Sequence, residues 1–493
     1  MSDEPVEADA APDGGTPAAV APEPDPRRWK ALWVCLVAGF MTLLDVSIVN
    51  VALPSIQAGV GATPSDLQWV VSGYALAFGL TLVPAGRIGD ALGRRTVFVV
   101  GVVLFGLASL ACGLAPNSTL LIAARLVQGA AGGILNPQVS GLIQQLFRGA
   151  ERGRAFGLLG ATIGISTAVG PVVGGIILDG LGQQSGWGWI FFVNLPIAVA
   201  AVLLAMRWLP DPPPRDAAQR IDADPVGVLL LGAGVLGILL PIVETGRGSA
   251  GVPWWVALVG GAFAVAFLAW ERAYTLRGRS PLVDLALFRV PGYASGAAVG
   301  TIYFGGFTGI FFVLTIFFQE QLDYSPLLAG LAVTPFAAGS AVTSAIGGRL
   351  VTRFERSLVT GGLTVVLVGL VAVDVVLGAV HGAALGWWLA GPLLVAGLGS
   401  GLVISPNITL TVAQVPVARA GTAGGLLQTG QRIGTAAGIA LVGAVFYSGV
   451  ASGAGLDAST ALRVAAALVA VALLASALDL RGRRRRGRAT STT

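Results

Sequence analysis

Charged residues are scarce in this sequence. Only 11% of its 493 residues are Asp, Glu, Lys or Arg, whereas about a quarter of a typical soluble chain is charged. Hydrophobic residues make up 55%, and the mean hydropathy is +0.80. The apolar residues come in blocks of about 20, the length of a helix that crosses a hydrocarbon core. A soluble globular protein is therefore excluded, and the 71 glycines are typical of closely packed membrane helices.

Cysteine and histidine are nearly absent, which removes several kinds of chemistry. The two cysteines, Cys35 and Cys112, lie inside apolar blocks and are too few for a disulfide framework or a four-ligand metal site. The single histidine, His381, falls in a loop between blocks. The sequence has no phosphate-binding Gly-Lys motif. We therefore expect neither an enzyme nor an ATP-driven pump, and no catalytic residue, metal or cofactor.

The N-terminal segment lacks basic residues. Residues 1–26 contain no Lys or Arg and are rich in Pro, Ala, Asp and Glu, a composition typical of disorder. A secretory signal peptide would begin with basic residues and end at a small-residue cleavage site. We expect residues 1–30 to form a disordered tail instead.

Fourteen apolar blocks follow this tail and predict an all-α polytopic membrane protein with 14 transmembrane helices. Two six-helix halves, at 31–208 and 291–480, would be separated by a linker with two inserted helices at 209–290 and followed by a basic tail at 481–493. The segment 86–94 recurs loosely at 348–356, as in the repeat architecture of transporters. The blocks lie roughly at 31–56, 68–89, 97–115, 119–142, 153–179, 189–208, 226–243, 253–271, 295–319, 326–348, 358–379, 386–410, 421–447 and 460–480.

Basic residues favour one side of the predicted bundle. If the chain crosses the membrane at each block, most of the 30 Lys and Arg lie on the side of the N-terminus. Cytoplasmic loops carry such an excess, so we expect both termini to be cytoplasmic and the protein to lie in the plasma membrane. The arginine-rich C-terminal tail would face anionic lipid. Nucleic-acid binding is the less favoured interpretation of the sequence pI near 9.7.

An aspartate lies inside the first block, in the segment LDVSIVN at 44–50. Asp45 is about 14 residues into the block, or roughly 21 Å at 1.5 Å per residue. A carboxylate at that depth costs about 2.5–3.5 kcal/mol, and a low dielectric favours its protonation. Asp45 is therefore a candidate proton-coupling site. The alternative is a structural carboxylate that pairs with an arginine or caps a helix break. Ser47 and Asn50 are candidates for hydrogen bonds to Asp45 or to a substrate.

Three more motifs stand out. The turn after the second block reads GRIGDALGRR at 86–95; its glycines permit a tight turn, and Asp90 is expected to cap a helix or pair with an arginine. The alternative is a simple basic turn. Arg125, in RLVQG at 125–129, stays charged and needs an acceptor, unless it reaches the interface. The fifth block contains GPVVGG at 170–175 among glycines spaced for close helix packing.

These motifs resemble those of the major facilitator superfamily, and more closely its 14-helix drug:proton antiporter branch, which includes multidrug, quaternary-ammonium and antibiotic-resistance exporters. The resemblance implies that Asp45 and Arg125 take part in proton coupling. It implies a conformational latch made of Gly86, Asp90, Gly93, Arg94 and Arg95. It also implies an antiporter motif made of Gly164, Gly170, Pro171, Gly174 and Gly175. The segment WGWIFFVNLP at 187–196 also resembles the branch. Two positions depart from the branch, with Ser47 in place of the usual Thr and Gly188 in place of the usual Arg.

The second half carries fewer charges within its apolar blocks. Asp374 is a candidate second proton site, with a solvated place at the outer interface as the alternative. Arg432 needs a partner, for which an anionic substrate, a backbone carbonyl and Asp45 are the alternatives. The polar residues expected to face a substrate cavity are Ser47, Asn50, Gln128, Asn136, Gln428 and Arg432.

We therefore predict a proton-coupled secondary exporter of drugs or antibiotic-like small molecules that works by alternating access. We expect it to act as a monomer whose partners are the small-molecule substrate, protons and membrane lipid, with no nucleic acid. A proton-coupled importer on the same fold is the main alternative, and a membrane receptor or scaffold is less favoured.

Overall fold

The computed structural model describes residues 26–182, 186–210, 224–244, 253–279, 281–283, 285–382, 384–451 and 457–490. Most of the expected N-terminal tail, parts of the expected linker and the last residues of the basic tail lie outside the described residues. In the described part, the chain forms helices and no β-strand. The predicted all-α fold is confirmed.

The helices follow the predicted blocks. The first half contains α1 (Arg28–Val60), α2 (Pro64–Leu92), α3 (Arg94–Gly113), α4 (Ser118–Leu146), α5 (Gly149–Leu181), α6 (Trp189–Phe192) and α7 (Asn194–Trp208). The inserted helices are α8 (Pro225–Glu244) and α9 (Trp255–Leu276), followed by the short η2 (Leu285–Arg289). The second half contains α10 (Tyr293–Ile316), η3 (Phe317–Gln321), α11 (Pro326–Ala379), α12 (Leu385–Val412), η4 (Val417–Arg419), α13 (Ala420–Ala451) and α14 (Ala458–Thr490).

Two of the predicted blocks form one long element, and one block is broken in two. The element α11 holds two helical segments, 326–354 and 356–379, that meet at Glu355, where the backbone φ is 44°. The sixth block is divided into α6 and α7 at Val193. Within the described residues, eleven helices are long and apolar enough to cross a membrane, with α11 counted once.

Local sequence sets the connection between α1 and α2. Gly61, in the left-handed region with φ 63°, ends α1. Thr63 and Asp66 then form a capping box, in which each side chain accepts a hydrogen bond from the other residue's backbone N–H. These bonds satisfy donors that an open helix end would leave unpaired.

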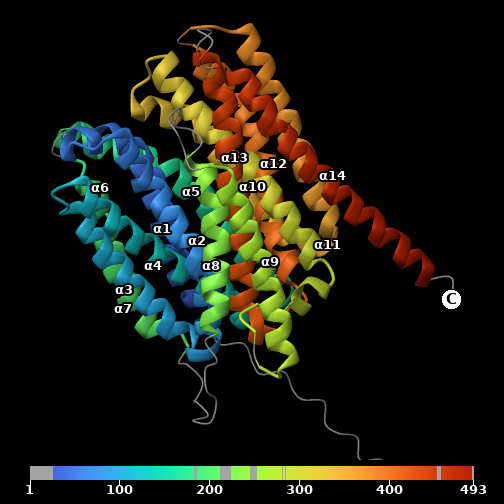
Figure 1. Ribbon diagram of the computed structural model, residues 1–493. Coiled ribbons are helices and arrows are strands. Elements are labelled where there is room, and N and C mark those ends of the chain that lie inside the picture. The colour runs from blue at the N-terminus through green and yellow to red at the C-terminus, as the bar shows by residue number, and fades with distance from the viewer. Residues whose placement is uncertain are drawn as a thin grey trace, which may run out of the picture.

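Each half has its own apolar core. Phe98 and Phe156 belong to the core of the first half, and Tyr303 and Phe446 belong to that of the second. Figure 1 shows the first half in blue and teal beside the second half in orange and red. The two halves meet along a seam, where α5 packs against α11 and α2 packs against α13.

Glycines allow the seam to close tightly where α2 ends and α3 begins, at what we term the α2–α3 end of the bundle. A Cβ built on Gly86 of α2 would lie 2.5 Å from the carbonyl oxygen of Gly421 on α13. A Cβ built on Gly153 of α5 would lie 2.4 Å from the carbonyl oxygen of Gly348 on α11. Side chains at these positions would therefore push the halves apart.

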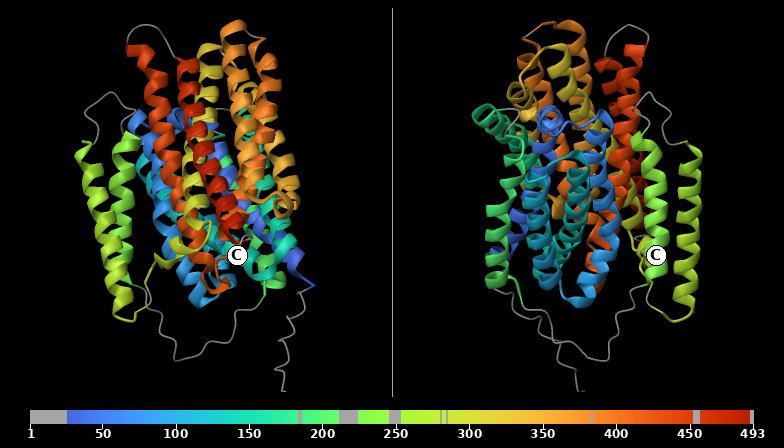
Figure 2. Two further views of the ribbon diagram at one scale, coloured as in Figure 1. Left: turned by 90° about the vertical axis from the view of Figure 1, so that its right-hand side faces the viewer. Right: turned by 60° about the vertical axis from the view of Figure 1, so that its left-hand side comes forward.

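The inserted helices form a hairpin at the edge of the bundle. Both views in Figure 2 show α8 and α9 side by side, outside the main group of helices. The hairpin is attached through α8, which packs against α2 and α13. Val235 of α8 contacts a small cluster that includes Leu76 and Ile433. The hairpin therefore covers the outside of the seam between α2 and α13.

Candidate functional site

The carboxylate of Asp45 is fully buried and paired with Arg125. The guanidinium Nη1 of Arg125 lies 2.6 Å from Asp45 Oδ2, and the two side chains are 0% and 2% exposed. Asp45 comes from α1 and Arg125 from α4, so the ion pair joins two helices of the first half. The sequence left two possibilities for Asp45, a proton-coupling site or a structural carboxylate paired with an arginine. The structure shows the pairing, and its partner is Arg125, the residue expected to share in proton coupling.

Neutral side chains complete the shell around this carboxylate. Gln128 and Asn194 each donate an amide hydrogen bond of 2.8 Å to Asp45 Oδ1. Both amides also donate to the hydroxyl of Ser109, which in turn donates to the carbonyl of Phe191. Asp45 therefore accepts three hydrogen bonds in a closed network.

The sequence did not identify Asn194 and Ser109 as members of this site. Asn194 lies directly after the break between α6 and α7, and its position as a lone uncharged polar residue inside the apolar block at 189–208 was the available signal. Ser109 lies in an otherwise apolar helix, where a serine has no distinguishing pattern. Gln128 was expected to face a substrate cavity, and the structure instead places it fully buried beside Asp45.

Arg125 also contacts aromatic rings and a backbone carbonyl. Its Nε donates to the carbonyl of Val70 at 3.0 Å. Its guanidinium carbon lies 4.2 Å from the ring centre of Tyr74 and 5.8 Å from that of Phe191. The expected alternative of a side chain reaching the membrane interface is therefore wrong, because Arg125 is 1% exposed.

A row of side chains leads from this ion pair to the seam. Tyr74 and Phe78, one turn apart on α2, have ring centres 6.0 Å apart. On the far side of Phe78, the guanidinium carbon of Arg432 on α13 lies 4.2 Å from the ring centre. Arg125, Tyr74, Phe78 and Arg432 thus form a cation–aromatic row, and we use that name below.

The other expected cavity residues lie in different surroundings. Ser47 donates to the carbonyl of Thr167 on α5 at 3.0 Å, and so joins α1 to α5. Asn50 is exposed. Asn136 is half-buried and donates to the carbonyl of Gly132 on its own helix. Gln428 is half-buried and donates to Ser140 Oγ at 3.4 Å, across the seam.

The expected latch residues bridge the two halves at the α2–α3 end. Asp90 of α2 accepts hydrogen bonds from the backbone N–H groups of Gly421 and Thr422, at 3.2 and 3.1 Å. These groups lie at the start of α13, and a helix N-terminus favours a carboxylate. Arg94 pairs with Asp90 at 2.9 Å and donates to the carbonyl of Val417 at 2.7 Å.

The remaining latch residues have separate roles in the geometry. Gly86 provides the close approach to α13 described above. Gly93, with φ 95°, makes the turn from α2 to α3 in a conformation that favours glycine. Arg95 donates to the carbonyl of Met206 on α7 at 2.6 Å, so it stays within the first half.

The loose sequence repeat has a structural counterpart. Glu355 aligns with Gly93, and both have a positive φ, of 44° and 95°. Arg356 aligns with Arg94, and both are buried. Arg356 donates to Asn407 at 2.7 Å and lies 3.3 Å from a carboxylate oxygen of Asp479. The second turn therefore anchors α11 inside its own half rather than across the seam.

The glycines of the expected antiporter motif pack α5 against both halves. A Cβ built on Gly170 would lie 2.5 Å from the Cβ of Ser47 on α1, and one on Gly174 would lie 3.0 Å from a side-chain carbon of the same helix. Gly164 and Gly175 face α11 instead, where the corresponding distances are 2.9 and 3.2 Å.

Pro171 of the same motif also lies on the seam. A Cβ built on Gly330 of α11 would lie 2.5 Å from the Cβ of Pro171. The motif thus lies on α5, the helix of the first half that packs along α11. A change in the angle between the halves would alter these close contacts.

Asp374 lies apart from Asp45. It accepts hydrogen bonds from Ser459 and Arg463 of α14, and the side chains of Asp374 and Arg463 are 24% and 65% exposed. These contacts match the solvated alternative more closely than a buried second proton site.

A buried carboxyl pair that the sequence did not single out lies at the base of the hairpin. Asp224 accepts hydrogen bonds from Trp270 Nε1 and from the backbone N–H of Gly227, and Glu271 accepts one from the N–H of Val283. A Cβ built on Gly227 would lie 2.3 Å from Asp224 Oδ2 and 2.8 Å from Glu271 Oε1. The two carboxyl groups therefore hold together α8, α9 and the segment that leads to η2.

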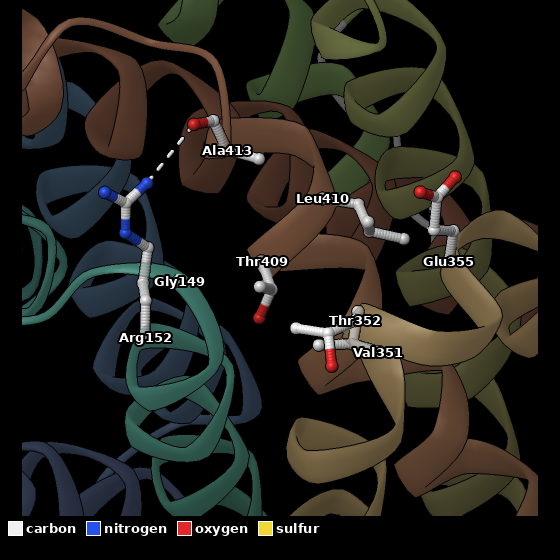
Figure 3. Close-up of a pocket in the computed structure, with 8 residues that line it drawn as sticks. All are labelled: Gly149, Arg152, Val351, Thr352, Glu355, Thr409, Leu410 and Ala413. Carbon is white, nitrogen blue, oxygen red and sulfur yellow. Dashed lines mark hydrogen bonds between the residues drawn. The ribbon is translucent and has the colours of Figure 1, made fainter.

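A pocket opens on the seam at the α2–α3 end. Figure 3 shows Arg152 and Glu355 on opposite sides of it, with Arg152 donating to the carbonyl of Ala413 at 3.2 Å. Its lining comes from α5, α11 and the end of α12: Gly149, Arg152, Val351, Thr352, Glu355, Thr409, Leu410 and Ala413. The Arg152 bond is a further bridge between the halves at the end where Asp90 and Arg94 also reach across the seam.

Comparison with known proteins agrees with this geometry. The sequence pattern of the Major Facilitator Superfamily matches residues 35–439. The probable actinorhodin transporter of Streptomyces coelicolor is 38% identical over 458 residues, which cover 90% of this chain and 78% of that protein. The puromycin resistance protein pur8 of Streptomyces alboniger is 38% identical over 429 residues, covering 86% and 82%. The tetracenomycin C resistance and export protein of Streptomyces glaucescens is 30% identical over 431 residues, covering 86% and 77%.

Solved structures share the fold at low sequence identity. The human organic anion transporter MFSD10 (TETRAN) matches with a TM-score of 0.65 and 15% identity over 92% of this chain and all of that one. The proton:xylose symporter XylE matches with a TM-score of 0.65 and 12% identity, covering 92% and 95%. The chain is thus a multi-pass membrane transporter that belongs to the Major Facilitator Superfamily, in the branch of antibiotic and multidrug exporters.

Proposed function

We propose that this protein is a proton-coupled exporter of drug-like small molecules in the plasma membrane. The observation that carries the proposal is the buried Asp45–Arg125 pair with its closed shell of hydrogen bonds. A carboxylate inside a membrane bundle marks an ion or proton path more often than it serves stability. Asp45 is the group in this network that exchanges a proton, because a guanidinium does not deprotonate in proteins.

Protonation of Asp45 would loosen the network. A neutral carboxyl group attracts Arg125 less strongly than a carboxylate does, and its new O–H needs an acceptor. Gln128 and Asn194 both donate to Asp45 Oδ1 as the network stands, so their amides would have to turn. The proton therefore changes the packing of α1 against α4 and α7, the helices that hold these side chains.

Alternating access is the motion that we propose to be coupled to this change. The halves touch along α5 with α11 and α2 with α13. The bridges that Asp90, Arg94 and Arg152 form at the α2–α3 end are hydrogen bonds that a rocking motion can break. We propose that this end is cytoplasmic, as are both termini, because its turns carry most of the basic residues. The described conformation is then the one closed toward the cytoplasm.

Export, rather than import, is supported by the relatives and by the motif in α5. The names of two relatives describe resistance, and one of these also describes export. The segment GPVVGG at 170–175 resembles the antiporter motif of the superfamily. The proposed substrates are accordingly drugs or antibiotic-like molecules.

The test measures proton release in inside-out vesicles. After energisation, addition of a transported drug should collapse the pH gradient in wild-type vesicles. Asp45→Asn should abolish this response, because the amide cannot exchange the coupling proton, while the protein still inserts and elutes as a single species. Drug flux in the opposite sense would establish an importer, and undiminished proton coupling in Asp45→Asn would remove Asp45 from the mechanism.

A further inference from the structure

Arg432 differs from the buried arginines of the bundle. It lies twelve residues into α13, or roughly 18 Å along the helix, and its side chain is half-buried. Its contact is the ring of Phe78, 4.2 Å from the guanidinium carbon. Within the described ranges it makes no hydrogen bond and no ion pair.

Among the described residues, three arginines are buried, and each lies close to a carboxylate. Arg94 lies 2.9 Å from Asp90, Arg125 lies 2.6 Å from Asp45, and Arg356 lies 3.3 Å from Asp479, each measured between nitrogen and oxygen. Charge in the middle of a membrane protein is costly unless it is paired or lines an aqueous path. Arg432 therefore has a charge that no described carboxylate neutralises.

Asp45, an alternative partner for Arg432, is already engaged. Its two oxygens accept three hydrogen bonds from Arg125, Gln128 and Asn194. The rings of Tyr74 and Phe78 lie between the two sites, as the cation–aromatic row shows. A partner for Arg432 must therefore come from outside the described chain.

The surroundings of Arg432 contain neutral hydrogen-bonding groups. Gln428 lies one turn earlier on the same face of α13, and its amide reaches Ser140 of α4 at 3.4 Å. Asn136 lies one turn from Ser140 and is half-buried. The cation of Arg432 and the amide of Gln428 on α13 therefore lie at the seam, beside Phe78 of α2 and Ser140 of α4.

We propose that Arg432 is the anchor of an anion-binding subsite, and that the substrates of this transporter carry an acidic group such as a carboxylate, a sulfonate or an acidic phenol. The planar guanidinium binds such groups through paired N–H donors, and Phe78 covers one of its faces, which holds the plane in position. Gln428, one turn before Arg432 on the same face of α13, can donate a further hydrogen bond to the same acidic group. This inference names the substrate class for the proposed export function and rests on it.

Equilibrium binding tests the charge preference directly. Fluorescein and rhodamine 123 share a xanthene ring system, but the first is an anion and the second a cation. The purified full-length protein in detergent micelles is titrated into each dye at neutral pH, and fluorescence anisotropy reports binding. Wild-type protein should bind fluorescein about tenfold or more tightly than rhodamine 123, as expected when one charge-assisted pair is formed.

Variants at one position separate charge from shape. Arg432→Gln should bind fluorescein about tenfold or more weakly than wild type and should bind rhodamine 123 as well as wild type does. Arg432→Lys should have a fluorescein affinity between those of Arg432→Gln and wild type, because it keeps the charge without the planar fork. Arg463→Gln, at an arginine that is 65% exposed, is the matched control and should bind as wild type does. All variants are compared by elution volume and thermal midpoint.

Three outcomes would overturn the subsite: no specific binding of fluorescein to wild-type protein, tighter binding of the cationic dye, or unchanged fluorescein affinity in both Arg432 variants. The measurement uses no gradient and no transport. A failure of proton coupling at Asp45 would therefore leave its result standing, and a failure of anion binding would leave proton-coupled export of other substrates intact.

Discussion

Single residues determine whether the fold remains stable with a buried ion pair in the membrane. Asp45 and Arg125 are stable inside the first half because each has all of its charge compensated locally, by each other and by the amides of Gln128 and Asn194. Removal of one partner would leave a buried charge without compensation, which is far more costly than the loss of an exposed pair.

A double replacement measures this dependence. Arg125→Ala should lower the free energy of unfolding by about 3–5 kcal/mol, because Asp45 then remains charged and unpaired. Adding Asp45→Asn should recover a large part of that loss. The comparison is made by chemical unfolding in mixed micelles at neutral pH.

The control is the exposed pair of Asp374 with Arg463. Arg463→Ala should change the unfolding free energy by about 0–1 kcal/mol, as is usual for exposed pairs. Equal stability of Arg125→Ala with and without Asp45→Asn would show that the uncompensated charge is not the cause.

The sequence predicted these residues unequally. The depth of Asp45 in its block and the charge of Arg125 were sufficient to select both. Their pairing was not accessible, because the residues are 80 positions apart and nothing local relates α1 to α4. Glu271 was missed since an acid at the end of an apolar block is typical of a solvated interface, and Asp224 was missed since it follows a polar, proline-rich stretch.

At the scale of helices, close backbone contacts control the seam. Replacing Gly86 with Ala should separate α2 from α13, because the added Cβ would lie 2.5 Å from a backbone oxygen that cannot move aside without its helix. The backbone N–H groups of Gly421 and Thr422 would then lose their bonds to Asp90. Hydrogen–deuterium exchange over residues 417–422 should become faster than in wild type.

Gly361 offers a matched control. It also lies within a helix, but a Cβ there would meet no atom within 4 Å, so Gly361→Ala should leave exchange over residues 417–422 unchanged. The same exchange rate in both variants would mean that the approach of α2 to α13 does not hold the bridge formed by Asp90.

Helices as units were the most predictable feature of the chain. Apolar block length located every described helix that the fold requires, since the bilayer imposes that length. The division of the sixth block into α6 and α7, and the merging of two blocks in α11, were not anticipated, because both depend on the backbone conformation of single residues, Val193 and Glu355. The arrangement of helices along the seam follows from glycine contacts between distant segments, which no local pattern encodes.

For the whole molecule, the charge of Arg432 bears on the energy source of export. The exit of one monovalent anion is electrically equivalent to the entry of one positive charge. If one such anion leaves for each proton that enters, each cycle therefore moves the equivalent of two positive charges into the cell. The membrane potential then contributes about 4.6 kcal/mol per 100 mV to each cycle, in addition to the pH gradient. Exchange of a proton for a monovalent cation would be electroneutral and would gain nothing from the potential.

Voltage dependence is therefore a property of the transporter that Arg432 implies. In proteoliposomes with the cytoplasmic face inward, a potassium diffusion potential that makes the interior negative should accelerate fluorescein efflux even without a pH gradient. Arg432→Gln should reduce that efflux. An efflux rate that does not change with the membrane potential would contradict an electrogenic exchange. A clear response would mean that cells can expel such compounds at alkaline external pH, where the proton gradient is weak but the potential persists.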